Sequence, residues 1–131
     1  MKKIIYSIFL IVFMACTANN VTTEKIDYDN TYSSFVISTN QFIELAKQNK
    51  KKDIDKFFVH TLKNRIILNE LKKQDFSNIL LFIPENKINI LSNNKINSLL
   101  VINFGTTSNY FDVVWIKDND IWKIYDVYER H

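Results

Sequence analysis

The stretch Tyr110–Tyr128, YFDVVWIKDNDIWKIYDVY, holds the strongest structural signal in this sequence. Aromatic and β-branched residues, which favour β-strands, fill both halves of the stretch. A polar segment of Asp and Asn separates the halves. The pattern predicts two antiparallel strands joined by a tight turn, which is a β-hairpin.

The length of that turn decides which side chains share a face. A two-residue turn fits at Asp118-Asn119 or at Asn119-Asp120. Because strand side chains alternate with a period of two, either turn places Trp115 and Trp122 on the same face. A four-residue turn, Lys117 to Asp120, keeps this arrangement, whereas a three- or five-residue turn would separate the two Trp side chains. We expect the Trp face to pack on helices.

The two faces of the hairpin carry different sets of residues. Phe111, Val113 and Ile124 share the face of the Trp residues. The opposite face carries Val114, Ile116, Lys123 and Tyr125. This second face is too apolar for open water, so it is a candidate surface for a homodimer or for another protein.

Shorter strand patterns precede the hairpin. Lys87–Leu91 alternates apolar and polar residues, and Ser98–Phe104 is a stronger strand pattern. Asn93-Asn94 and Gly105–Asn109 are predicted turns. The stretch Phe76–Ile83 fits a buried strand or a helix end, and the proline that follows closes it because proline cannot donate a ladder hydrogen bond.

Helical periodicity dominates the chain before these strands. From Tyr32 to about Asn49, one stripe of residues recurs with helical spacing. The stripe consists of Phe35, Thr39, Phe42, Ile43 and Ala46. Thr31 or Ser33 is expected to cap this helix, since hydroxyl side chains accept hydrogen bonds from the first turn.

Two further helical segments are predicted before the strands begin. Asp53 fits the N-cap of the first, whose inner face would carry Ile54, Phe57 and Phe58. A second stripe, Leu62, Ile66, Ile67 and Leu71, indicates a segment ending near Lys73, either continuous with the first or kinked near Thr61. Helices followed by strands are typical of an α+β fold, here with N-terminal helices packed against an antiparallel sheet of three to five strands.

The N-terminus carries a different kind of signal. Lys2 and Lys3 precede an apolar run, Ile4–Met14, which is too short to span a bilayer but has the proportions of a signal-peptide core. The run ends at Cys16, the only cysteine of the chain. The sequence Phe13-Met14-Ala15-Cys16 resembles a bacterial lipobox, which implies cleavage before Cys16 and attachment of lipid to it. We therefore predict an envelope lipoprotein with its signal peptide at 1–15.

Composition and charge limit the remaining possibilities. The chain has 131 residues, of which 47% are hydrophobic, so one domain with a real core is expected. Residues 16–31 lack strand or helix periodicity and are predicted to be a polar tether, which leaves 32–131 as the domain. Without Lys2 and Lys3 the chain has 15 basic and 14 acidic residues, which does not favour nucleic acid binding.

Two segments resemble the NTF2-like superfamily, whose members are related in shape to cystatin-like α+β cones. The pairing of 41–46, QFIELA, with 52–58, KDIDKFF, is similar to its opening helices. The ending 115–127, WIKDNDIWKIYDV, is similar to its last hairpin, although Lys52 and Asp120 stand where glycines are common. The resemblance covers about residues 35–128. It implies a curved sheet wrapped around helices, with a pocket at the open end.

Some enzymes of that superfamily use an Asp or an Asp-His pair as base, with a Tyr as hydrogen-bond donor. The candidate pocket residues here are His60, Tyr110, Asp112, Tyr125 and Asp126. Asp112 and Asp126 lie on adjacent predicted strands and could face each other, although a solvated pair is the more ordinary arrangement. None of these residues matches a catalytic position of the family, and the sequence lacks metal-ligand, phosphate-loop and nucleophile motifs. We predict no metal and no cofactor.

These signals favour a non-catalytic binding domain on an envelope lipoprotein, for a small apolar ligand or an envelope protein partner. An NTF2-like isomerase, dehydratase or hydrolase, and an immunity- or inhibitor-type lipoprotein, are the alternatives. The space between sheet and helices is expected to be filled, because its candidate side chains are large and none is small. They are Phe35, Phe42, Phe57, Phe58, Leu99, Val101, Trp115 and Trp122.

Overall fold

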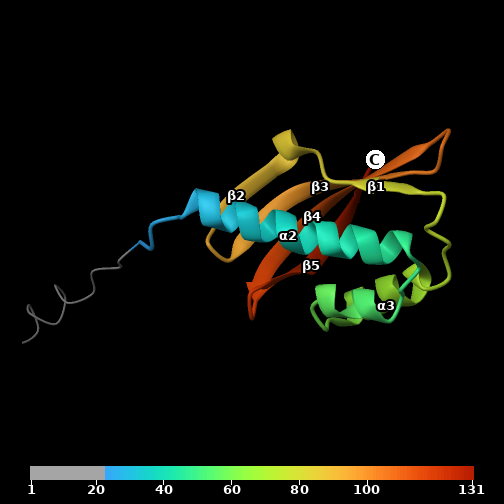
Figure 1. Cartoon of the computed structure of the whole chain (residues 1–131), viewed down its shortest axis with the longest axis horizontal. Coiled ribbons are helices and arrows are strands. Elements are labelled where there is room, and N and C mark those ends of the chain that lie inside the picture. Colours follow the sequence, from blue (N-terminus) through green and yellow to red (C-terminus); the bar gives the residue numbers. More distant parts are fainter. Residues whose placement is uncertain (1–22) are drawn as a thin grey trace, which may run out of the picture.

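The computed structural model describes residues 23–131, so the predicted signal peptide and Cys16 lie outside the described part. Its elements are α2 (Tyr28–Lys47), the 3-10 helix η1 (Asp53–Phe57), α3 (Leu62–Leu71), β1 (Leu80–Phe82), the 3-10 helix η2 (Glu85–Lys87), β2 (Ile88–Ser92), β3 (Lys95–Asn103), β4 (Ser108–Asp118) and β5 (Ile121–Arg130). The helices α2 and α3 pack against an open five-stranded antiparallel sheet (Figure 1). The predicted α+β class is confirmed.

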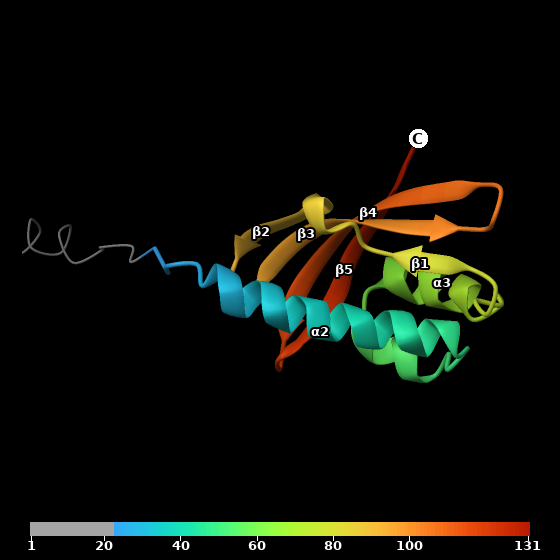
Figure 2. The same ribbon diagram turned by 45° about the horizontal axis from the view of Figure 1, so that its top comes forward.

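The sheet is built around β3. Its strand order is β1-β3-β4-β5, and β2 also pairs with β3. The first half of β3 pairs with β2, and Val101–Asn103 pair with β1, so β1 and β2 follow one another along the same edge (Figure 2). The ambiguous stretch Phe76–Ile83 therefore contains a short strand, with Phe76 buried in the loop before it.

Helix α2 begins earlier than predicted. The side chain of Asp27 accepts a hydrogen bond from the backbone N–H of Asn30 and caps the helix at Tyr28. Thr31 and Ser33, the predicted caps, therefore lie inside the helix, and the last residues of the predicted tether form its first turn. Asn93 holds the arm that leads into α2: it accepts from the N–H of Asp27 at 2.8 Å and donates to the carbonyl of Lys25 at 3.1 Å.

The buried faces of the helices agree with the predicted stripes for α2 and η1 but differ for α3. Phe35, Phe42 and Ala46 of α2 are buried, as are Ile54 and Phe57 of η1 and Phe58 after it. In α3 the predicted Leu62 and Ile66 are exposed, whereas Asn64 and Leu68 are buried. The reason is Asn64, whose side-chain amide bonds to β5 and turns its own face of the helix inward.

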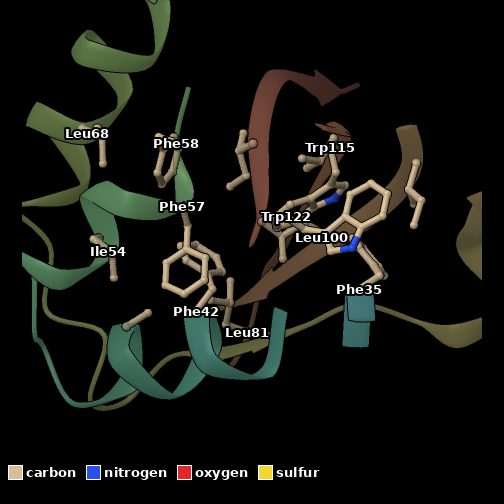
Figure 3. Close-up of a cluster of buried hydrophobic side chains, with 14 residues drawn as sticks. Phe35, Phe42, Ile54, Phe57, Phe58, Leu68, Leu81, Leu100, Trp115 and Trp122 are labelled. Atoms are coloured by element: carbon tan, nitrogen blue, oxygen red, sulfur yellow. The ribbon is translucent and has the colours of Figure 1, made fainter. Parts of the chain in front are cut away.

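The hairpin of β4 and β5 has the two-residue turn Asn119-Asp120. Both residues adopt positive φ angles, 50° and 63°, as tight hairpin turns require. The two Trp residues lie on one face, as predicted, and both are fully buried. The ring of Phe35 meets Trp115 and Trp122 edge-on, with centroid distances of 5.3 and 5.7 Å (Figure 3).

A β-bulge in β5 changes the register beyond Ile124. Trp115 pairs with Ile124, but Val114 pairs with Asp126, which leaves Tyr125 as the extra residue. Past the bulge, Val127 opposite Val113 continues the inner face, and Asp126 lies on the outer face. The sequence pattern alone does not show this shift.

The predicted complete filling of the interior is wrong in two respects. Leu99 and Val101 lie on the outer face of the sheet, because they alternate with Ile96 and Leu100, which belong to the core. In addition, Ala46 is a small buried residue that leaves room near the end of α2. Phe35, Trp115 and Trp122 fill one end of the interior, which we call the Trp end. The other end lies beneath α3, around Ala46, and we call it the cavity end.

Candidate functional site

An apolar cavity of about 90 Å³ lies at the cavity end, between the helices and the sheet. All of its lining residues are apolar: Phe42, Ala46, Ile54, Phe58, Ile67, Leu71, Phe76, Leu81, Leu100, Ile102, Phe111, Ile124 and Val127. They come from every layer of the fold, namely α2, η1, α3 and the four strands β1, β3, β4 and β5. The cavity is thus a product of the whole tertiary structure rather than of one motif.

The cavity lies beside a small residue of α2, around which the larger lining side chains leave space. Phe42 and Ala46 stand one helical turn apart on α2, and the short Ala46 side chain ends before reaching the sheet. The Phe42 ring packs against Phe57 and Phe58 with centroid distances of 5.7 and 6.0 Å and closes the side toward the Trp end (Figure 3).

The opening of the cavity follows from the burial of its lining. Most lining residues are buried, but a subset from α3 and from the ends of three strands remains part-exposed. This subset consists of Ile67, Leu71, Ile102, Phe111 and Val127. The cavity therefore opens between α3 and the ends of β3, β4 and β5.

This cavity can bind an apolar group by removing it from water. Its lining side chains supply no hydrogen-bond donor, acceptor or charge. An apolar group entering such a cavity leaves water without losing hydrogen bonds, whereas a polar group would lose them. Within residues 23–131, no group of three or more His, Cys, Asp or Glu is placed to hold a metal ion.

The residues predicted to form a pocket do not line this cavity. His60 is exposed in the loop between η1 and α3, and Tyr110 is exposed on β4. Tyr125 is the exposed bulge residue of β5. Asp112 and Asp126 lie on the outer face of the sheet, where Asp112 pairs with Tyr128 and Asp126 with Val114.

The two carboxylates are bound to separate cations. Asp112 accepts two hydrogen bonds from the guanidinium of Arg130. Asp126 accepts hydrogen bonds from Lys63 and from the Tyr128 hydroxyl, and both lower its pKa below the ordinary value. The hydrogen bond to Asp126 in turn raises the pKa of Tyr128. A carboxylate that serves as a general base works best with a raised pKa, so the lowered pKa of Asp126 does not suit that role.

The residues of the predicted interaction face lie on the outer side of the hairpin. Val114 and Ile116 are half-buried there, and Lys123 lies opposite Ile116 and pairs with Asp118 at 2.8 Å. The same face continues over neighbouring strands as a set of exposed aromatic rings. They are Tyr110, which was predicted as a pocket residue, and Phe82 and Tyr128, which the sequence analysis did not name.

The cavity residues of α3 and of the strand ends were also missed by sequence reasoning. Ile67 and Leu71 stood in a predicted stripe, but nothing local shows that they border empty space. The one available signal is Ala46, which is the smallest member of an otherwise bulky stripe.

Comparison of the chain with protein-family models, with curated proteins and with solved structures finds no match. Of the helices in the described part, none is long and apolar enough to cross a membrane.

Proposed function

We propose that this chain is a bacterial envelope lipoprotein whose single NTF2-like domain binds a small apolar group without catalysis. The observation that carries the binding proposal is the wholly apolar lining of the cavity beneath α3. The anchor is supported by the lipobox-like sequence that ends at Cys16, which would hold the domain on the cell envelope.

The volume of the cavity limits what it can hold. A cavity of about 90 Å³ corresponds to about three water-sized volumes. This suits the end of an acyl chain, or a branched apolar group of a few carbons, rather than a whole large ligand. Dry apolar cavities of about 150 Å³ are known to take up xenon or benzene, so xenon is a suitable probe.

Xenon binding in crystals or by NMR tests the cavity. Wild type should show one xenon site bordered by Phe42, Leu100 and Phe111. Ala46→Leu fills the cavity and should abolish the site. Gln41→Leu, on the exposed face of the same helix, adds a leucine without filling the cavity and should leave the site intact. Absence of xenon from the wild-type cavity, or its persistence in Ala46→Leu, would refute the binding proposal.

The anchor has a separate test. Cys16→Ser should leave the signal peptide uncleaved or release the protein from membrane fractions. Unchanged processing and fractionation of that variant would refute lipidation.

A second candidate function is protein binding through the outer sheet face, to a second copy or to another envelope protein. It is favoured by the exposed rings of Phe82, Tyr110 and Tyr128 beside half-buried Val114 and Ile116. Sedimentation of wild type and of Val114→Glu tests the homodimer. A dimer that the variant dissociates supports it, and a wild-type monomer at high concentration contradicts it.

A further inference from the structure

Helix α3 covers the cavity but is thinly packed. It contributes Ile67 and Leu71 to the cavity wall, and Leu68 is its one buried apolar side chain. Leu62 and Ile66 are 71% and 58% exposed. The helix lies at the end of the domain remote from the N-terminal arm (Figures 1 and 2). Much of its apolar inner side therefore borders the cavity rather than a solid core.

The first turn of α3 is held to β5 by polar contacts on two sides. Inside, the Asn64 side-chain amide donates to the carbonyls of Val59, Ile124 and Tyr125 at 2.9, 3.0 and 3.2 Å. Outside, Lys63 pairs with Asp126, and its Nζ lies 4.2 Å from the centroid of the Tyr128 ring. The first turn of α3 thus meets β5 at its bulge, where the Ile124 carbonyl also accepts from the backbone N–H of Val59 at 2.9 Å.

The other end of α3 is also held by polar contacts. The Lys72 Nζ lies 2.9 Å from Asp55 Oδ2, and the Lys51 Nζ donates to the Lys72 carbonyl at 2.7 Å. Both the lysine and the aspartate of the ion pair are more than one third exposed, so water can replace the contact easily.

The polar contacts at each end of α3 include a buried side-chain oxygen that lacks a hydrogen bond. Across the described residues, the buried side-chain atoms without a hydrogen-bond partner are Asn64 Oδ1 and Asp55 Oδ1. Each loses solvation in the closed position, and each regains it when water enters. These desolvated oxygens offset part of the stabilisation that the polar contacts give to the closed position of α3.

We propose that α3 is a lid that opens locally, admitting an apolar group to the cavity while α2 and the strands β3–β5 stay folded. Its role as a lid rests on the proposed function, since only a cavity that binds something needs one. The opening itself belongs to the empty protein and is measured without ligand.

Amide hydrogen exchange on wild type tests the opening. The amides of α3 should be at least about tenfold less protected than those of β3 and β4, and their exchange should not depend on low denaturant concentrations, as for a local opening. If α3 amides share the protection and the denaturant dependence of β3 and β4, the helix opens only with the whole domain and the proposal is overturned.

A pair of substitutions localises the cause. Asp55→Asn breaks the ion pair with Lys72 and should reduce the protection of α3 amides by about two- to fivefold, leaving β3 and β4 nearly unchanged. Asp118→Asn breaks a matched pair with Lys123 at 2.8 Å, at the end of β4 beside the hairpin turn, and should leave α3 unaffected. A uniform loss of protection in Asp55→Asn, or no loss, contradicts the lid.

The lid and the binding proposal fail in different ways. If xenon occupies the cavity but α3 opens only globally, binding stands and the lid is wrong. If α3 opens locally but wild type takes up no xenon, the opening stands and the binding function is wrong.

Discussion

The Trp end and the cavity end of this domain use the same sheet face but are built differently. At the Trp end, Nε1 of Trp115 donates to Ser98 Oγ and Nε1 of Trp122 to Ser34 Oγ, both at 2.9 Å. The backbone N–H of Trp122 also donates to Ser38 Oγ. At the cavity end, a void remains and Asn64 Oδ1 has no partner.

This difference indicates that the two ends of the core contribute differently to stability. Three serines complete the hydrogen bonds of the largest side chains, so the Trp end combines dense packing with satisfied polar groups. The cavity end lacks both properties, and such regions contribute less to stability and open more readily. The Trp end is therefore expected to maintain the fold while the cavity end is free to bind.

The largest expected effect is on the free energy of unfolding, when a buried phenylalanine at each end is replaced by alanine. Phe35→Ala removes a ring that contacts both Trp residues and should lower the free energy of unfolding by about 4–5 kcal/mol. Phe58 borders the existing cavity, so Phe58→Ala loses fewer contacts and should lower the free energy of unfolding by about 3 kcal/mol. Urea unfolding measures both. Equal losses, or a larger loss for Phe58→Ala, would remove the distinction between the two ends.

The next effect concerns the anchor of α3. Asn64→Ala removes the donor to the carbonyls of Ile124 and Tyr125 and should lower the free energy of unfolding by about 2 kcal/mol. Asn69→Ala, at an exposed position of the same helix, is the control and should be neutral or slightly stabilising. If both variants unfold at the same urea concentration, Asn64 is not an anchor.

Filling the cavity should have the opposite sign. At about 24 cal/mol per Å³, a void of about 90 Å³ corresponds to about 2 kcal/mol. Ala46→Leu should therefore raise the free energy of unfolding by up to about 2 kcal/mol, with Gln41→Leu as the surface control. A destabilised Ala46→Leu would show that the void is too narrow for a leucine, because overpacking strains the surrounding side chains.

The smallest expected effect is a loss of stability at low pH, caused by two aspartates near the cavity end. Hydrogen bonds from the backbone and side chain of Ser77 lower the pKa of Asp75 to about 2, and the pKa of Asp126 is lowered by Lys63. Because both values lie below those of the unfolded chain, the stabilisation is present above about pH 4 and is lost as pH falls toward 2. Unfolding at pH 5 and at pH 2.5 should show a smaller decrease in the variant Asp75→Asn/Asp126→Asn than in wild type. An equal decrease would assign the acid sensitivity to other carboxylates.

The sequence allowed the local structure to be predicted better than the site. Alternation and turn chemistry located the hairpin and the shared face of the Trp residues, and they limited the turn to a few alternatives that include the observed Asn119-Asp120, since these features depend on neighbours in sequence. The bulge at Tyr125 and the inward rotation of Asn64 depend on contacts across about 60 residues, so no local pattern reports them. The cavity depends on side chains from seven elements, and its existence is a property of their joint packing.

The hydrogen bonds of Asn93 to the N-terminal arm determine where the arm leaves the domain. The arm leaves the domain beside the β2–β3 turn, because Asn93 binds Lys25 and Asp27 there. Ala46 lies 18 residues beyond Tyr28 on α2, which places the cavity about 27 Å along the helix from that exit point. The N-terminal arm and the cavity thus lie toward opposite ends of α2, so an anchor attached through this arm would join the domain at the end remote from α3.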